Sequence, residues 1–225
     1  MERVVIALSG GLDSSTLLGV LLHDGKEVHC ALFKYPSKHN PFEMESALNV
    51  IDYYKQKGFP VYFKIFDLTG VFTHFHSNLL MNGGDIPEGH YQQENMKLTV
   101  VPGRNAIFAT IMAGYAESMQ INKIYLGVHA GDHAIYPDCR PDFIESITKT
   151  ILLSTGGSVY VHTPFINLSK AHIVAIGNTL NVPYELTRTC YKDQPIACGK
   201  CGSCNERLEA FESNNLKDSI QYELS

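Results

Sequence analysis

A cluster of glycine, hydroxyl and carboxylate residues directly follows an apolar run near the start of the sequence, in SGGLDSS at 9–15. Gly10 and Gly11 let main-chain N–H groups approach an anion closely. A helix is expected to follow at once, and its N-terminus adds partial positive charge at the same point. Asp13 would repel a phosphate unless a cation lay between them. The segment therefore predicts a phosphate site with Mg²⁺ on Asp13. The alternative is a strand–helix turn that needs glycines, with Ser and Asp capping the helix.

Four of the six cysteines crowd together near the C-terminus, in the pattern C-x7-C-x2-C-x2-C. Two thiolates separated by two residues can bind one tetrahedral ion, and the pattern repeats that spacing. Four thiolates form a closed shell without an open position. The pattern therefore predicts a structural zinc site, with an iron–sulfur cluster as the alternative. The predicted ligands are Cys190, Cys198, Cys201 and Cys204.

Two cations stand where helices are expected to begin. Arg104 and Asn105 follow Pro-Gly in VPGRN, and Lys170 lies in NLSKAHI. A guanidinium can bind a phosphate or a carboxylate through two parallel hydrogen bonds, and Asn105 can cap the helix or contact a ligand. Lys170 can reach a phosphate from the start of its helix. Solvent-exposed positions remain open for Arg104 and Lys170, since most cations lie on protein surfaces.

Functional groups are also dense in GVHAGDHAIYPDCRPDF at 127–143. They are Asp132, Tyr136, Asp138, Cys139 and Arg140. A loop that carries so many functional groups directly after a strand predicts ligand binding. The spacing of these groups does not indicate a particular reaction. A free thiol is more often a small buried apolar group than a nucleophile, so we expect Cys139 to be buried.

Apolar runs alternate with helical patterns along the chain. Strands are predicted at 4–8, 27–35, 61–68, 123–129 and 159–164, and helices at 14–25, 41–58, 104–120, 141–154 and 169–181. This alternation predicts an α/β fold, a doubly wound five-stranded parallel sheet. Ligands of such sheets bind beyond the carboxyl ends of the strands, where the segments described above lie. The irregular stretch 73–97 is predicted to be a functional loop or lid.

Bulk composition sets further limits on function. The chain has 225 residues, of which 44% are hydrophobic, with a net charge of -5 and a pI of about 6.0. No basic field exists to attract a nucleic-acid backbone, which disfavours direct nucleic-acid binding. We also expect no membrane span and no export signal, and hence a cytoplasmic protein. One main domain at 1–186, with a four-cysteine zinc-binding segment packed on it at 187–225, is the expected organisation.

Several of these motifs together resemble those of one known family. SGGLDSS resembles the PP-loop of N-type ATP pyrophosphatases, which cleave ATP between the α and β phosphates while adenylating a substrate oxygen. Taken with VPGRN, GVHAGDHAIYPDCRPDF, LSKAHI and TCYKDQPIACGKCGSC, it makes nearly the whole chain similar to the 7-cyano-7-deazaguanine synthase (QueC) family. The YPDCR block and the four-cysteine tail are the most specific part of this resemblance.

The resemblance implies a ligase of the queuosine type of deazapurine biosynthesis. Such an enzyme converts 7-carboxy-7-deazaguanine and ammonia to 7-cyano-7-deazaguanine through adenylated acid and amide intermediates, with AMP as the expected nucleotide product. It implies one structural Zn²⁺ per chain, Mg²⁺ with ATP, and a homodimer. No protein nucleophile is needed, because a pyrophosphate leaving group held by main-chain donors and Mg²⁺ makes a carboxylate reactive.

The resemblance also implies roles for individual residues. Catalytic roles fall to Asp13, Arg104 and Asp132. The ATP-binding residues are Leu8, Ser9, Gly10, Gly11, Leu12, Asp13, Ser14, Ser15 and Thr16. The substrate-binding residues are Arg104, Asn105, Tyr136, Asp138, Arg140 and Lys170.

Departures from the family pattern keep alternatives open. The stretch YPSKHNPFE differs from the family at Pro36 and Ser37. A divergent member could stop at 7-amido-7-deazaguanine, or could serve DNA modification or defence rather than tRNA. A tRNA-modifying PP-loop ATPase is a second alternative, which the acidic balance disfavours. A non-enzymatic zinc module is the third, and it would leave SGGLDSS and YPDCR unexplained.

Overall fold

The computed structural model describes residues 1–223, and they contain a five-stranded parallel sheet. In order across the sheet the strands are β3 (Val61–Asp67), β2 (Glu27–Lys34), β1 (Arg3–Ala7), β4 (Lys123–Tyr125) and β5 (Tyr160–His162). β1 lies at the centre, where Val5 pairs with His29 on one side and with Ile124 on the other. The predicted α/β class and the five-stranded parallel sheet are therefore confirmed.

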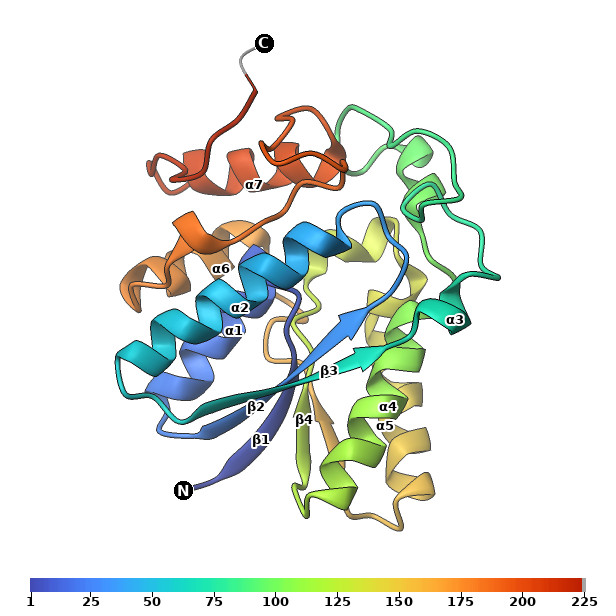
Figure 1. Cartoon of the computed structure of the whole chain (residues 1–225), viewed down its shortest axis with the longest axis vertical. Helices are drawn as coiled ribbons and strands as arrows, with labels where there is room; N and C mark the ends of the chain where they lie inside the picture. Colours follow the sequence, from blue (N-terminus) through green and yellow to red (C-terminus); the bar gives the residue numbers. More distant parts are fainter. Residues whose placement is uncertain (224–225) are drawn as a thin grey trace.

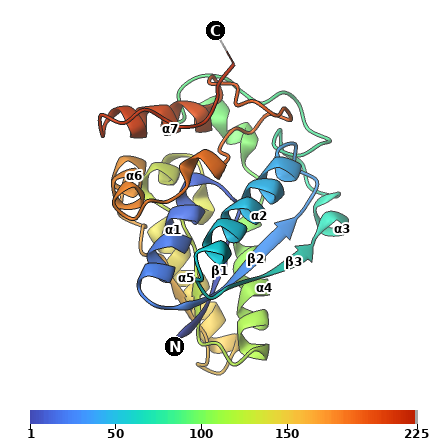
Figure 2. The ribbon, with the colours of Figure 1, turned by 60° about the vertical axis from the view of Figure 1, so that its left-hand side comes forward.

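Helices cover both faces of the sheet (Figure 1). One face packs α1 (Leu12–His23), α2 (Asn40–Gln56) and α6 (Lys170–Thr179), and the other packs α4 (Arg104–Ser118) and α5 (Pro141–Ser154). Apolar side chains of the strands fill both interfaces, which explains why the central strands read as continuous apolar runs. Figure 2 shows the same two helical layers from the side.

Strands β4 and β5 are shorter than predicted. The apolar pattern predicted strands at 123–129 and 159–164, but regular pairing covers only Lys123–Tyr125 and Tyr160–His162. The Leu126 N–H still donates to the His162 carbonyl at 3.0 Å, after which the chain leaves the sheet and Gly127 passes beside the backbone of Asp13 and Ser14. The apolar residues that follow are buried against the polar loop and not in a strand, so periodicity alone could not end the strand correctly.

A C-terminal helix, α7 (Gly202–Glu212), was not predicted. Its first turn lies within the cysteine motif, and its buried face includes the polar residues Glu206 and Arg207. A helix that buries charged residues shows no simple apolar stripe, so this segment carries no helical signal in its hydrophobic pattern. Figure 1 places α7 above α6, at the end of the molecule toward which the strands point.

The predicted irregular stretch is largely confirmed. The short helix α3 (Thr69–Phe72) precedes it, and the 3₁₀ segment η1 (Glu94–Thr99) begins near its end. Its backbone contacts the cysteine segment, since the Gly89 N–H donates to the Lys200 carbonyl at 3.0 Å. No helix within residues 1–223 has the length and apolarity that a membrane crossing demands.

Candidate active site

The loop between β1 and α1 presents hydrogen-bond donors at the carboxyl end of the central strand. Gly10 has a φ of 76°, in the left-handed region, and a side chain there would collide with the backbone of α2. The Ser9 and Ser14 hydroxyls lie 3.1 Å apart, and the Gly11 N–H donates to Ser9 Oγ at 3.2 Å. Gly11, the N-cap residue of α1, makes no side-chain cap bond, so the helix N-terminus is available to an anion.

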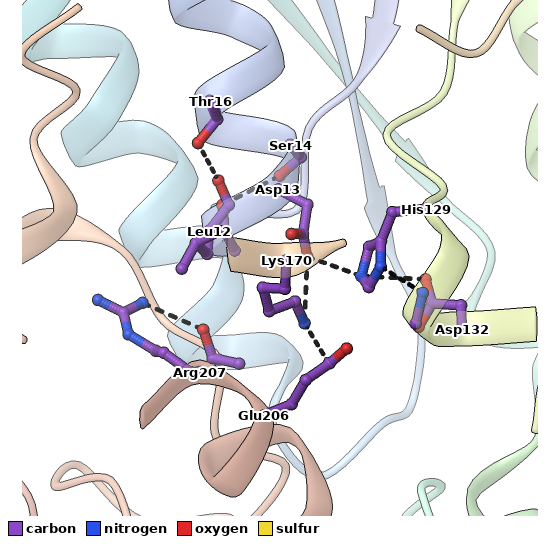
Figure 3. A network of polar contacts seen from close by, with 12 residues as sticks. Leu12, Asp13, Ser14, Thr16, His129, Asp132, Lys170, Glu206 and Arg207 are labelled. Atoms are coloured by element: carbon purple, nitrogen blue, oxygen red, sulfur yellow. Dashed lines mark hydrogen bonds and ion pairs between the residues drawn. The ribbon is translucent and has the colours of Figure 1, made fainter. Parts of the chain in front are cut away.

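Asp13 lies beside this loop in a cluster of charged side chains from four elements (Figure 3). Its Oδ2 is 3.5 Å from the Lys170 ammonium nitrogen and 3.7 Å from His129 Nε2. Within residues 1–223, Asp13 Oδ1 is buried and has no hydrogen-bond partner. A buried carboxylate oxygen without a partner fits a hard cation such as Mg²⁺, for which oxygen is the preferred ligand.

Lys170 is held between two carboxylates. Its ammonium group lies 2.5 Å from Glu206 Oε2 on α7, and the side chain is only 6% exposed. Burial alone would lower the pKa of Lys170, but the negative charges of Asp13 and Glu206 raise it above its ordinary value. Burial raises the pKa of Glu206 in spite of the neighbouring Lys170. Lys170 is therefore not solvent-exposed; it is a buried, charged residue at the phosphate loop.

His129 fixes the other side of the cluster. Its side chain is 1% exposed, and Nε2 lies 3.5 Å from Asp132 Oδ2. The Gly131 N–H donates to His129 Nδ1 at 3.1 Å. An accepting Nδ1 assigns the ring proton to Nε2, between the carboxylates of Asp13 and Asp132. Nε2 lies between the carboxylates of Asp13 and Asp132 but makes no hydrogen bond to either within residues 1–223.

A cleft of about 230 Å³ joins this cluster to the ends of the neighbouring strands. The sequence-predicted residues that line it are Leu8, Ser9, Gly11, Leu12, Asp13, Ser14, Arg104, Asn105, Asp132, Tyr136 and Lys170. The predicted residues that do not line it are Gly10, Ser15, Thr16, Asp138 and Arg140.

The predicted residues outside the lining have other contacts. Thr16 Oγ1 bonds within α1 to the Leu12 carbonyl and lies 2.8 Å from the Tyr184 hydroxyl. Asp138 Oδ2 accepts the Asn105 N–H at 3.0 Å, which fixes the start of α4. Arg140 Nε donates to the His133 carbonyl at 2.8 Å. Asp138 therefore acts on the cleft through Asn105.

Aromatic rings also line the cleft. The Phe33 and Phe108 rings stack with centroids 3.9 Å apart and an interplanar angle of 3°. Tyr35 packs edge-on against Phe108, and its hydroxyl accepts from Arg104 Nη1 at 3.4 Å. Flat apolar faces beside a guanidinium suit a planar heterocycle that carries an anionic group.

Cys139 is buried beside this aromatic side, as predicted. Its Sγ lies 3.2 Å from Asn105 Nδ2, and the side chain is 4% exposed. Burial raises the pKa of the Cys139 thiol well above its ordinary value, and the charges of Asp132 and Asp138 raise it further. A neutral thiol is a poor nucleophile, which supports a packing role.

The four C-terminal cysteines come together as predicted. All are buried, and their sulfur atoms lie within 4.8 Å of one another. Cys198 Sγ and Cys204 Sγ are 3.9 Å apart, close to the roughly 3.8 Å edge of a tetrahedron with metal–sulfur bonds of about 2.3 Å. The Lys200 and Cys201 N–H groups point at Cys198 Sγ at 3.4 and 3.3 Å. The geometry fits one tetrahedral metal ion.

A family model decides the classification of the chain. The model described as "Queuosine biosynthesis protein QueC" matches residues 3–215. The chain belongs to the QueC family. Among curated relatives of this QueC chain, the 7-cyano-7-deazaguanine synthase of Pseudoalteromonas atlantica is 41% identical, over 99% of this chain and 100% of the relative. The 7-cyano-7-deazaguanine synthase 1 of Colwellia psychrerythraea is 43% identical, over 99% of each chain.

Solved structures support the fold of the family member. A 4-thiouridine synthetase, in an RNA complex with bound ATP, superposes with a TM-score of 0.56 at 18% identity. The match covers 98% of this chain and 47% of the synthetase. At that identity the likeness shows a shared fold.

Several residues of the QueC cleft were missed by sequence reasoning. They are Phe33, Tyr35, His39, Glu43, Tyr91, Phe108, Arg188, Tyr191 and Glu206, together with His129 behind the lining. Tyr191 is the clearest example, since the Tyr136 hydroxyl lies 3.2 Å from the Tyr191 hydroxyl and 2.9 Å from Thr99 Oγ1. The sequence held a signal for two of them: Phe33 and Tyr35 stand at the carboxyl end of a predicted strand.

Proposed function

We propose that this chain converts 7-carboxy-7-deazaguanine and ammonia to 7-cyano-7-deazaguanine with two molecules of ATP, in queuosine-type deazapurine biosynthesis. The relatives that carry the synthase name share its whole length. One structural observation carries the proposal. A single cleft joins the donors of the phosphate loop to an aromatic surface with its own guanidinium, so a nucleotide and a planar acid can meet there.

Activation of the acid is the first half of the proposed reaction. A carboxylate oxygen attacks the α-phosphorus of ATP, pyrophosphate leaves, and an acyl adenylate forms. Ammonia then adds to the carbonyl carbon, AMP leaves with the transferred oxygen, and the nitrogen loses a proton to give the amide. The second half repeats the activation on the amide oxygen. AMP again departs with that oxygen, and loss of the remaining N–H protons gives the nitrile.

The chain's own groups suit the developing charge on pyrophosphate. The N-terminus of α1 and the hydroxyls of Ser9 and Ser14 supply neutral donors, and the buried Lys170 supplies a positive charge. We propose that Asp13 holds Mg²⁺, which when bound neutralises phosphate charge. Such preorganised donors stabilise a leaving group in a site that excludes water. Asp132 and Arg104 complete the proposed catalytic set from the other walls.

The remaining parts of the proposal concern organisation. We propose that the four cysteines bind one structural zinc ion, because their sulfur spacing suits it and no ligand position is left for substrate. A main domain at 1–186 would carry the cysteine segment at 187–225, whose residues 224–225 lie outside the described part. A homodimer in the cytoplasm completes the proposal.

Product mass tests the proposed function. The protein is incubated with 7-carboxy-7-deazaguanine, ammonium and Mg-ATP, and deazapurine mass and AMP are followed over time. The expected products are the nitrile and two AMP per nitrile. The amide alone would identify an enzyme that stops halfway, and no AMP-linked product at all would refute an adenylating ligase for this substrate. A parallel incubation without ammonium controls for idle ATP hydrolysis.

A further inference from the structure

Arg104 is a cation in the cleft whose charge is not matched by a partner. Its hydrogen bond to the Tyr35 hydroxyl is long, at 3.4 Å, and no carboxylate within residues 1–223 forms an ion pair with it. Two acids lie nearby. Asp138 Oδ2 accepts the Asn105 N–H. Glu43 pairs with His39 at 3.2 Å; burial alone would raise the pKa of Glu43, but the charges of His39 and Arg104 lower it. Burial alone would lower the pKa of Arg104, yet the phenol of Tyr35 and further groups, Asp138 among them, raise it above its ordinary value. The guanidinium is therefore charged, and its only side-chain hydrogen bond within residues 1–223 is the long one to Tyr35.

The other two cations of the cleft lining are already engaged. Lys170 is paired with Glu206 and Asp13. Arg188 also has no ion-pair partner within residues 1–223, but its terminal nitrogens donate to three main-chain carbonyls of the cysteine segment, at 3.1, 2.8 and 2.6 Å. A partly buried guanidinium without an anion is costly unless a ligand supplies one. The arrangement of charges thus calls for an anionic group of the ligand at Arg104.

The surroundings of Arg104 indicate what kind of anion this is. Arg104 begins α4, on the opposite face of the sheet from α1, whose N-terminus and hydroxyls provide for phosphate. The wall beside it is aromatic, with Tyr35 edge-on to Phe108 at 5.7 Å and Phe33 stacked on Phe108. A planar heterocycle lying on these rings would direct a ring-bound carboxylate at the guanidinium.

We infer that Arg104 binds the carboxylate of the planar acid through its two-pronged guanidinium, and that it selects the acid over the corresponding neutral amide. The inference rests on the proposed function, in which both compounds are substrates of successive steps. An amide offers one neutral acceptor, and its NH₂ group would meet the donors of Arg104. Arg104 therefore contributes strongly to acid activation and weakly to amide activation.

Separate assays of the two half-reactions test this specificity. Pyrophosphate release is measured with 7-carboxy-7-deazaguanine plus ammonium, and separately with 7-amido-7-deazaguanine, for the wild type and for Arg104→Met. We expect kcat/KM for the acid to fall at least about 100-fold, the value of two charge-assisted hydrogen bonds, and kcat/KM for the amide to fall less than about tenfold. Arg104→Lys keeps the positive charge but loses the two parallel donors of the guanidinium. It should therefore recover part of kcat/KM for the acid.

Controls separate this specificity from other roles of Arg104. Lys149→Met removes an exposed cation from α5 and should change neither half-reaction. Equal losses in both half-reactions, with weaker binding of a non-hydrolysable ATP analogue, would overturn the inference and assign Arg104 to phosphate. A wild type that turns over neither compound refutes the proposed function instead. In that case calorimetric binding of the acid and of the amide decides the inference: acid binding that Arg104→Met does not weaken overturns it.

Discussion

The carboxylate of Asp13 lies between two groups of different character, the Lys170 ammonium at 3.5 Å and His129 Nε2 at 3.7 Å. Lys170 supplies a full positive charge that holds Oδ2, whereas His129 Nε2 lies beside it without forming a hydrogen bond. Oδ1 has no partner in the described chain and remains available to a cation. A carboxylate fixed on one oxygen and free on the other is suited to hold a metal ion in a defined position.

Replacing Asp13 with Ala tests this role of the carboxylate. We expect kcat of the variant to fall at least about 100-fold, because one preorganised charge at the leaving group is lost. The fold should persist, since the Asp13 side chain is 22% exposed. Pyrophosphate release measured across Mg²⁺ concentrations, with a thermal melt of each protein, checks both points. Unchanged kinetics would contradict the assignment.

Glu206 is expected to position Lys170. Glu206→Gln keeps the size of the side chain but removes the charge that holds the ammonium nitrogen at 2.5 Å. We expect kcat to fall at least about tenfold because Lys170 would turn fully toward Asp13, the competing carboxylate. The matched control is Glu212→Gln, on the exposed face of the same helix. A merely structural role would lower the melting temperature while leaving the KM for ATP and kcat of the folded fraction unchanged.

At the scale of elements, the cysteine segment builds part of the cleft. It contributes Glu206 at the second turn of α7 and Tyr191, which directly follows Cys190. It also holds the irregular stretch 73–97, since Lys192 pairs with Glu88 at 2.5 Å and Asn205 Nδ2 donates to the Gly89 carbonyl at 2.7 Å. A metal ion on the four thiolates would therefore order both the segment and the loop above the cleft.

Loss of one thiolate should destabilise both the cysteine segment and the irregular stretch 73–97. Cys201→Ser is expected to lose the bound metal, lower the melting temperature and speed amide hydrogen exchange in 73–97 and 187–223, because metal binding is coupled to folding of such sites. Elemental analysis, thermal melts and exchange measured by mass spectrometry provide the readouts. Lys200→Ala, an exposed change in the same turn, is the control. A metal-loaded Cys201→Ser protein with unaltered exchange would contradict this view of the segment.

At the scale of the whole molecule, a buried ion pair fastens the C-terminal part to the domain. Arg207 is fully buried and binds Asp218 through two nitrogens, at 2.7 and 2.9 Å. Its third nitrogen donates to Thr187 Oγ1 at 2.7 Å. Burial alone would raise the pKa of Asp218, but the hydrogen bonds and charge of Arg207 lower it below its ordinary value.

Stability should therefore depend on pH through Asp218. Because its pKa is lowered in the folded state, its contribution is complete above the ordinary pKa of about 4 and is lost as pH falls through the lower folded value. Asp218→Asn should cost about 3 kcal/mol at neutral pH, since it leaves a buried guanidinium uncompensated. Urea unfolding at pH 7 and in acid measures both effects. Glu94→Gln, which breaks an exposed pair with Lys97, should change little.

The proposed homodimer is a second prediction at this scale. β3 is an edge strand whose exposed residues include Tyr62, Phe63 and Ile65, which are 51%, 41% and 41% exposed. An exposed apolar edge is a template for pairing with another chain, so we expect a second copy to cover it. Light scattering should give twice the 25.0 kDa chain mass, and Ile65→Lys should shift it toward the monomer. Leu153→Lys on α5 is the control; a wild-type monomer would disprove the dimer.

The sequence by itself determined the features that depend on local spacing. Apolar runs alternating with helical patterns are enough to predict the parallel sheet, because a chain with that order has few ways to bury its strands. The glycines and hydroxyls placed after the first strand predicted the phosphate loop at its carboxyl end. The two-residue spacing of Cys198, Cys201 and Cys204 predicted that their thiolates would meet, since neighbours in one turn lie within reach of one ion.

Only the tertiary structure decided which distant residues share the cleft. Glu206 reaches Lys170 across 36 positions of sequence, and Tyr35 meets Arg104 across 69. Such pairs depend on how helices pack on the two faces of the sheet, which no local pattern records. The same holds for α7, whose buried Glu206 and Arg207 are tolerable only because partners from other elements satisfy their charges. The number of partners, rather than residue type, distinguishes Arg104 from Lys170 and Arg188. In the described part of the chain, Arg104 has one long side-chain hydrogen bond, whereas each of the other two has several polar partners.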